Sequence, residues 1–189
     1  NPTELLFGRG MIANVANRVP TGTPVLLLFG GGSIKRNGVY DQVKAALRQH
    51  QVIEFGGIEA NPLYETCLRA VAELKAVKAG FILAVGGGSV LDAAKFIAAA
   101  ACDDGSDPWD IMRRGGQSIR AAIPVGTVLT LPATGSESNG NSVISRQATQ
   151  EKLAMASPLV FPVFSVLDPE TTFSLPAKQV RNGVVDAFI

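Results

Sequence analysis

The stretch Phe81-Ile82-Leu83-Ala84-Val85-Gly86-Gly87-Gly88-Ser89-Val90-Leu91-Asp92-Ala93-Ala94-Lys95 decides the fold of this chain. An apolar run breaks into three glycines and a serine, and apolar residues then recur at helical spacing from Val90 to Ala101, which predicts a strand, a tight turn and a helix. Residues without a Cβ let backbone N–H groups approach an oxyanion, and the helix directs its unpaired N–H groups at the same point. The pattern indicates a phosphate site, although similar glycine turns in other sheets bind nothing.

The same order of strand, loop and helix recurs upstream. Val25–Phe29 is a continuous apolar run, typical of a strand buried on both faces of a parallel sheet, and it leads into a second glycine–serine turn, Gly30-Gly31-Gly32-Ser33. A third unit has a strand over Gln51–Phe55, a loop that includes Asn61, and a helix over Tyr64–Val77. This alternation predicts a parallel sheet with helices on both faces, and ligand-binding loops at the carboxyl ends of the strands.

The remaining segments complete an α/β domain with a small hairpin. The last helix, from Ala177 onward, carries Val180, Val184 and Phe188 on one stripe and has no cap at its end, so we expect the chain to be a fragment. The other predicted strands cover Thr3–Phe7, Ala121–Leu131 and Val163–Leu167, the hairpin pairs Ser142–Arg146 with Lys152–Ala156, and further helical segments cover Met11–Val19 and Trp109–Arg113.

Composition excludes several classes of protein. The chain has 189 residues, 47% of them apolar and 17% charged, with a net charge of +1, which is typical of a globular protein with a buried sheet. No basic stripe, membrane-length apolar run or secretory signal stands out, so we expect no nucleic-acid partner, no membrane contact and a cytoplasmic location. Cys67 and Cys102 read as core residues, and Trp109 as a packing anchor. The single histidine, His50, ends a helix and is no candidate for catalysis.

Three motifs in a fixed order resemble the iron-containing (group III) alcohol dehydrogenase family. They are Gly86-Gly87-Gly88-Ser89 with Asp92 and Lys95, then Leu131-Pro132-Ala133-Thr134-Gly135-Ser136-Glu137, then Asn182-Gly183-Val184-Val185-Asp186-Ala187-Phe188. The loop Phe55–Pro62 and the early Gly30–Ser33 turn are similar to the NADPH-dependent aldehyde reductase, or butanol dehydrogenase, branch. The resemblance covers the N-terminal half of such proteins. It implies a dehydroquinate synthase-like fold, with an NADP-binding domain over 1–176 and, over 177–189, the first helix of an all-helical metal-binding domain.

The resemblance also assigns roles to individual residues. Asp92 would contact the nicotinamide ribose or amide, although an acid at this position also suits the helix dipole. Asp186 would be the first of four ligands to a divalent metal, Fe²⁺ or Zn²⁺; the next, a histidine four residues on, lies past Ile189, so we expect this chain alone neither to retain the metal nor to catalyse. The cofactor-binding residues implied are Gly31, Gly32, Ser33, Asn61, Gly87, Gly88, Ser89, Asp92, Thr130, Thr134 and Lys152.

The choice between NAD and NADP depends on the loop after Phe29. Enzymes that prefer NAD usually present a carboxylate to the adenosine ribose, and this loop has none before Asp41. It offers glycines, Ser33 and the positive charges of Lys35 and Arg36, which favours NADP. The alternative is a glycine turn followed by two solvated bases, which leaves the preference unassigned.

The function implied is reversible, metal-assisted hydride transfer between NADP(H) and an aldehyde or primary alcohol in a homodimer. No general acid or base is evident in this half of the protein. Three alternatives stay open: an NAD-linked, zinc-dependent polyol dehydrogenase of the same fold, a dehydroquinate-synthase-like lyase, and a nucleotide-binding module without catalysis.

Overall fold

A parallel six-stranded sheet forms the centre of the domain in a computed structural model, which describes residues 1–105 and 107–188. The order across the sheet is β1-β8-β5-β4-β2-β3, and every neighbouring pair runs parallel, as the alternating pattern predicts. The bounds are β1 (Glu4–Phe7), β2 (Val25–Phe29), β3 (Val52–Phe55), β4 (Phe81–Gly87), β5 (Val125–Leu131) and β8 (Phe164–Leu167).

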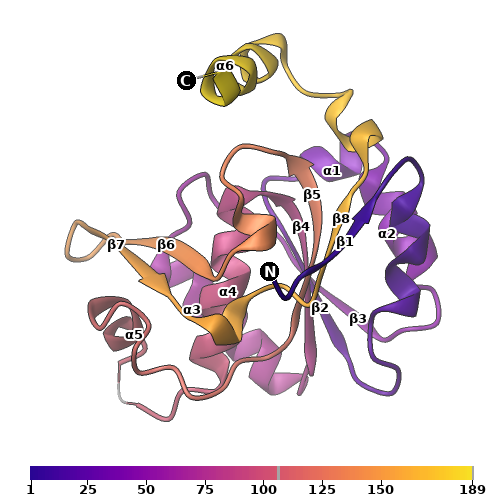
Figure 1. The fold of residues 1–189 in the computed structure, drawn as a ribbon. Coiled ribbons are helices and arrows are strands. Elements are labelled where there is room, and N and C mark those ends of the chain that lie inside the picture. Colours follow the sequence, from indigo (N-terminus) through magenta and orange to yellow (C-terminus); the bar gives the residue numbers. More distant parts are fainter. Residues whose placement is uncertain (106, 189) are drawn as a thin grey trace.

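Helices lie on both faces of the sheet (Figure 1). The side chains of the strands alternate between two apolar cores, one on each face. On β2, Leu26 and Leu28 pack toward α3, α4 and α5, whereas Leu27 and Phe29 pack toward η1, α1 and α2. This explains why the central strands read as continuous apolar runs. The helical bounds are η1 (Met11–Asn17), α1 (Ser33–Arg36), α2 (Val39–Ala46), α3 (Tyr64–Ala76), α4 (Gly88–Ala101) and α5 (Trp109–Arg113).

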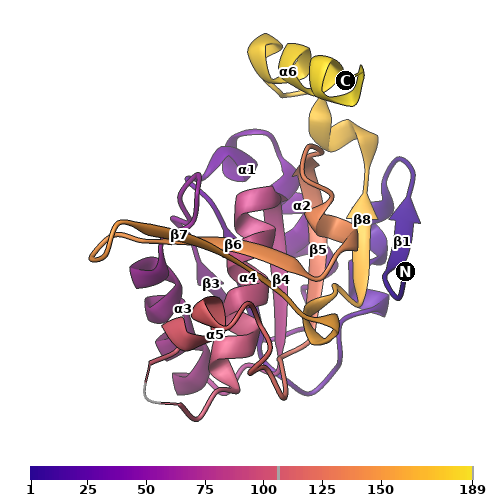
Figure 2. The ribbon, with the colours of Figure 1, turned by 60° about the vertical axis from the view of Figure 1, so that its left-hand side comes forward.

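The helix α4 lies between two layers of structure. One side packs on the sheet, and the antiparallel hairpin of β6 (Asn141–Arg146) and β7 (Glu151–Ala156) crosses the other side (Figure 2). Eleven of its fourteen residues are buried, which explains the Ala-rich sequence, because small side chains let both layers approach the helix. The hairpin prediction is confirmed, and the hairpin covers the helix that carries the glycine turn.

Some sequence-based predictions need correction. The strand expected from Ala121 begins at Val125, because Pro124 has no N–H for the sheet and the N–H of Ile123 bonds to a helix carbonyl instead. The helical segment expected over Met11–Val19 is a 3-10 helix, with i to i+3 bonds, that ends at Asn17. Cys67 is buried as expected, but the prediction of a core position for Cys102 is wrong, since it is exposed where α4 ends.

The sheet reverses its winding direction between β2 and β4. From β2 the chain passes through α2 to β3 at one edge, whereas from β4 it passes through α4 to β5 on the other side. In open parallel sheets, ligands bind beyond the carboxyl ends of the strands at such a reversal. The two glycine–serine turns follow β2 and β4 directly, so both border this crevice.

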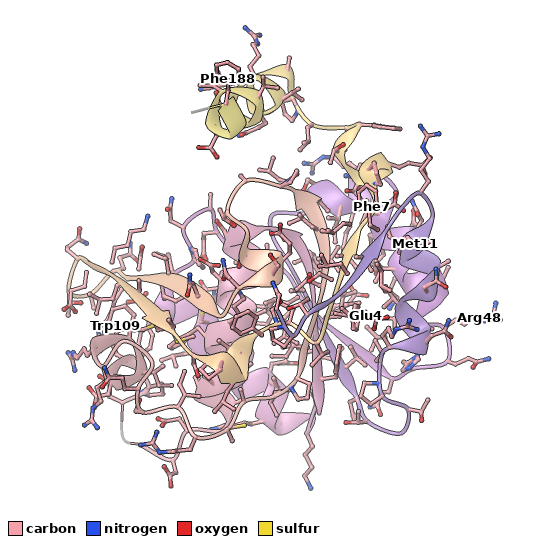
Figure 3. All side chains as sticks on the ribbon, viewed as in Figure 1. Glu4, Phe7, Met11, Arg48, Trp109 and Phe188 are labelled. Carbon is pink, nitrogen blue, oxygen red and sulfur yellow. The ribbon has the colours of Figure 1, made fainter. Side chains whose placement is uncertain are left out.

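The C-terminal segment lies apart from the domain body (Figures 1 and 3). The 3-10 helices η2 (Ser136–Ser138), η3 (Pro158–Val160) and η4 (Pro169–Thr172) precede it, and α6 covers Ala177–Phe188. The predicted apolar stripe of α6 is exposed; Phe188, for example, is 92% exposed. No helix among the described residues combines the length and apolarity that crossing a bilayer requires.

Candidate cofactor-binding site

The turn between β4 and α4 builds an open helix N-terminus. The strand runs to Gly87 and the helix begins at Gly88, and no side chain in the described part of the protein caps the helix with a hydrogen bond. A Cβ at Gly88 would lie 2.8 Å from Cγ2 of Thr134, so only glycine lets the β5–β6 loop approach this closely. The first N–H groups of α4 therefore keep free hydrogen-bonding capacity, which is the arrangement that binds phosphate in other nucleotide sites.

Three of the predicted cofactor residues come from separate segments and meet beside this turn. The backbone N–H of Asn61, after β3, donates to Oγ of Ser89 at 3.3 Å, and Nζ of Lys152, on β7, donates to Oδ1 of Asn61 at 2.7 Å. Asn61 has a φ of 60°, a left-handed conformation that asparagine adopts more readily than most residues. The cluster places a positive charge and a hydroxyl at the border of the crevice.

The turn after β2 is the second wall of the crevice. Gly32 has a φ of 89°, which favours glycine, and a Cβ at Gly31 would meet no atom within 4 Å, so the backbone there is open. Ser33 begins α1 and is exposed. These three predicted residues thus present backbone N–H groups and a hydroxyl on the β2 side.

A carboxylate that sequence reasoning missed lies close to this second turn. Glu54, on the neighbouring strand β3, accepts a hydrogen bond from Tyr40 at 2.6 Å and forms ion pairs with Lys44 at 3.1 Å and Lys35 at 3.5 Å. The hydrogen bond from Tyr40 and the two lysines hold the pKa of Glu54 below its usual value. Lys35, one of the two predicted positive charges, is therefore paired with Glu54, whereas the other, Arg36, is exposed.

Asp92, in the first turns of α4, is half-buried and its carboxylate is held by two hydrogen bonds. Its Oδ1 accepts from the hydroxyl of Ser136 at 2.6 Å, and its Oδ2 accepts from the N–H of Val143 at 3.0 Å. Burial raises the pKa of Asp92, and these two bonds together with Lys95 oppose that shift. The carboxylate is thus oriented by the loop and the hairpin above it.

Lys95, one turn further along α4, is completely buried. Its Nζ donates to Oγ of Ser136 at 2.8 Å, to Oδ1 of Asn139 at 3.0 Å and to the carbonyl of Asn141 at 2.9 Å. Burial lowers the pKa of Lys95 to about 8, against the attraction of Asp92 and Glu137. At neutral pH the three acceptors match the three N–H groups of an ammonium.

The lowered pKa of Lys95 predicts a specific pH dependence of stability. Between the folded value, about 8, and the reference value of 10.5, the unfolded chain binds more protons than the folded chain, so folding becomes more favourable as pH rises. We expect the free energy of unfolding of the wild type, relative to Lys95→Met, to increase by about 2 kcal/mol from pH 7.5 to 9.5. Urea unfolding of both proteins at the two pH values measures this. A constant difference would mean that Lys95 titrates normally.

The remaining predicted residues lie at the end of β5 and on α6. Thr130 is the penultimate residue of β5, and Thr134 follows in the loop over Gly88. Asp186, which is exposed on α6, lines a cavity of about 210 Å³ between that helix and the β5–β6 loop. The other lining residues are Leu131, Pro132, Ala133, Gln179, Asn182 and Gly183.

The described residues do not make a metal site by themselves. A carboxylate such as that of Asp186 is a suitable ligand for a divalent metal, but within residues 1–105 and 107–188 no three His, Cys, Asp or Glu side chains gather as a possible site. His50 lies beyond the end of α2, where its Nε2 is 3.4 Å from the carbonyl of Val19.

Comparison with known proteins identifies the family. The family model described as "Iron-containing alcohol dehydrogenase" matches residues 2–169. The chain belongs to the iron-containing alcohol dehydrogenase family. This confirms the resemblance drawn from the three motifs and the expected fold.

Related proteins match the chain over almost its full length. The NADPH-dependent aldehyde reductase YqhD of Escherichia coli is 57% identical over 100% of the chain and 49% of its own length. A probable NADH-dependent butanol dehydrogenase of Bacillus subtilis is 50% identical over 98% of the chain and 48% of its own length. The crystal structure of E. coli YqhD has a TM-score of 0.96 at 57% identity, over 99% of this chain and 48% of that one. The chain thus spans about half the length of these relatives.

Proposed function

We propose that this chain is the cofactor-binding half of a metal-dependent oxidoreductase that transfers hydride reversibly between NADP(H) and an aldehyde or primary alcohol. The observation that carries the proposal is the uncapped N-terminus of α4, beside which Ser89, Asn61 and Lys152 meet at the winding reversal of the sheet. The names of the relatives, an aldehyde reductase and a probable butanol dehydrogenase, support the substrate class.

In this proposal the chain's residues bind and orient the cofactor. The N–H groups at Gly87, Gly88 and Ser89 hold the diphosphate, with Thr130 and Thr134 at its nicotinamide side. Lys152 and Asn61 contact the ribose and adenosine portions. Asp92, fixed by its two hydrogen bonds, faces the nicotinamide end. When bound, the nicotinamide supplies or accepts the hydride and the metal polarises the substrate oxygen.

NADP is proposed over NAD because of the second glycine turn. Gly31, Gly32 and Ser33 offer close backbone and hydroxyl donors for a 2′-phosphate. The carboxylate of Glu54, which forms an ion pair with Lys35 just after this turn, is also paired with Lys44 and accepts a hydrogen bond from Tyr40. The NADH-dependent names of several relatives, at up to 50% identity, make NAD the alternative.

The metal and the second domain are further parts of the proposal. Asp186 would supply one ligand to a divalent metal; the family name favours iron, and no observation on this chain favours zinc. Residues 1–176 would form the NADP-binding domain and 177–189 the start of a helical domain, which the exposed apolar stripe of α6 supports. The cytoplasmic location and the homodimer stay predictions.

Steady-state kinetics of the full-length protein test the cofactor proposal. With butanal as substrate, we expect kcat/KM for NADPH to exceed that for NADH by about tenfold or more, which is about 1.4 kcal/mol of discrimination. Ser33→Asp should remove this preference, because its carboxylate repels the 2′-phosphate. A preference for NADH in the wild type would favour an NAD-linked enzyme, and binding of nucleotide without turnover would favour a non-catalytic module.

A further inference from the structure

The buried charge of Lys95 has no role in the proposed cofactor contacts. The side chain lies between α4 and the β5–β6 loop, and all three of its acceptors belong to the segment from Ser136 to Asn141. A buried ammonium is costly unless its N–H groups are all paired, and here each has an acceptor. The ammonium of Lys95 therefore holds the segment from Ser136 to Asn141 against α4, the helix whose N-terminus is the proposed phosphate site.

The hydroxyl of Ser136 links this cation to Asp92. A serine hydroxyl has one proton, and because its oxygen accepts a hydrogen bond from Lys95, that proton is directed at Oδ1 of Asp92. The second oxygen of Asp92 is fixed by Val143. Charged hydrogen bonds in a buried network are stronger than neutral ones, so the pair Lys95–Ser136 restricts the carboxylate to one orientation.

We propose that Lys95 is a positioning residue that acts through Ser136 to hold the Asp92 carboxylate toward the nicotinamide end of the cofactor. The charged groups that face Lys95 are Asp92 on its own helix and Glu137 on the loop. This inference rests on the proposed function, in which Asp92 contacts the nicotinamide part of the cofactor. Loss of the Lys95–Ser136–Asp92 hydrogen bonds should therefore weaken contacts to the nicotinamide end of the cofactor and leave contacts to the adenosine end unchanged.

Two serine variants of the full-length protein separate positioning from packing. Ser136→Ala removes the hydroxyl that bonds the Asp92 carboxylate, whereas Ser142→Ala removes an equally buried hydroxyl that bonds the backbone carbonyl of the same residue at 2.7 Å. Dissociation constants are measured for NADPH and for 2′,5′-ADP, which lacks both the nicotinamide ring and the ribose that carries it. We expect Ser136→Ala to weaken NADPH about tenfold and the ring-less ligand less than about twofold, and Ser142→Ala to weaken neither by more than about twofold.

Each other outcome has a defined meaning. Equal losses for both ligands, or equal effects of Ser136→Ala and Ser142→Ala, would show that the network only supports packing and would overturn the inference. If the Lys95→Met variant folds, it should show the same selective loss of NADPH affinity. If it does not fold, the result for Ser136→Ala alone tests the inference. Failure of the wild type to bind either ligand would instead refute the proposed function itself.

Discussion

Replacement of Gly88 by alanine is expected to weaken NADPH binding by at least about tenfold, or about 1.4 kcal/mol. The added methyl group would lie 2.8 Å from Cγ2 of Thr134, so the β5–β6 loop must move away from α4. It would also occupy the space where a phosphate approaches the first N–H groups of the helix. Fluorescence titration of the full-length variant with NADPH measures the change.

A second substitution separates the two causes of this loss. In Gly88→Ala/Thr134→Ala the clashing atoms Oγ1 and Cγ2 are gone, and the remaining contact with Cβ of residue 134 is 3.1 Å. We expect the double variant to regain most of the thermal stability that Gly88→Ala loses, but to bind NADPH at least about tenfold more weakly than Thr134→Ala alone, the reference that accounts for contacts of Thr134 itself. Recovery of both properties would mean that the glycine serves the turn alone and that phosphate binds elsewhere.

The second large effect is expected at Asp186. In the full-length protein, Asp186→Ala should reduce bound metal and lower kcat by at least about a hundredfold, since the loss of an outer-shell partner alone commonly costs 10- to 100-fold. NADPH affinity should change by less than about threefold, because Asp186 lies on α6 and not at the glycine turns. Metal analysis by mass spectrometry and steady-state kinetics on one sample measure both quantities.

The matched control for Asp186 is Glu73→Ala. Glu73 is also an exposed acid on a helix, in α3 on the domain body. It should leave the metal content and kcat within about twofold of the wild type, as expected for an ordinary surface substitution. Full metal content in Asp186→Ala would refute the ligand assignment.

Local sequence patterns predicted most of the fold. Glycine–serine turns after continuous apolar runs located β2 and β4 and the helices that follow them, because a doubly covered parallel strand has no polar face to interrupt the pattern. The Ala-rich pattern after Ser89 predicted a helix, and the hairpin that buries its second side explains why it has so few polar residues. The predicted start of β5 was wrong because Pro124, which lacks an N–H for the sheet, interrupts an otherwise apolar run.

The parts of the site that depend on tertiary contacts were not predictable. Glu54 follows the glycine turn by a whole helix, and it reaches Lys35 only because β3 pairs with β2. Lys95 belongs to a recognisable motif, but its partners lie on a loop more than forty residues away. Sequence spacing places a residue on an element and gives no information about which distant loop packs against it.

A structure of the full-length protein with NADPH bound tests the central claim most directly. We expect the diphosphate to lie at the N-terminus of α4, with its oxygens about 3 Å from the N–H groups at Gly88 and Ser89. The nicotinamide should lie on the Asp92 side of the crevice and the 2′-phosphate beside Ser33. A diphosphate bound away from the β4–α4 turn would contradict the proposed cofactor site.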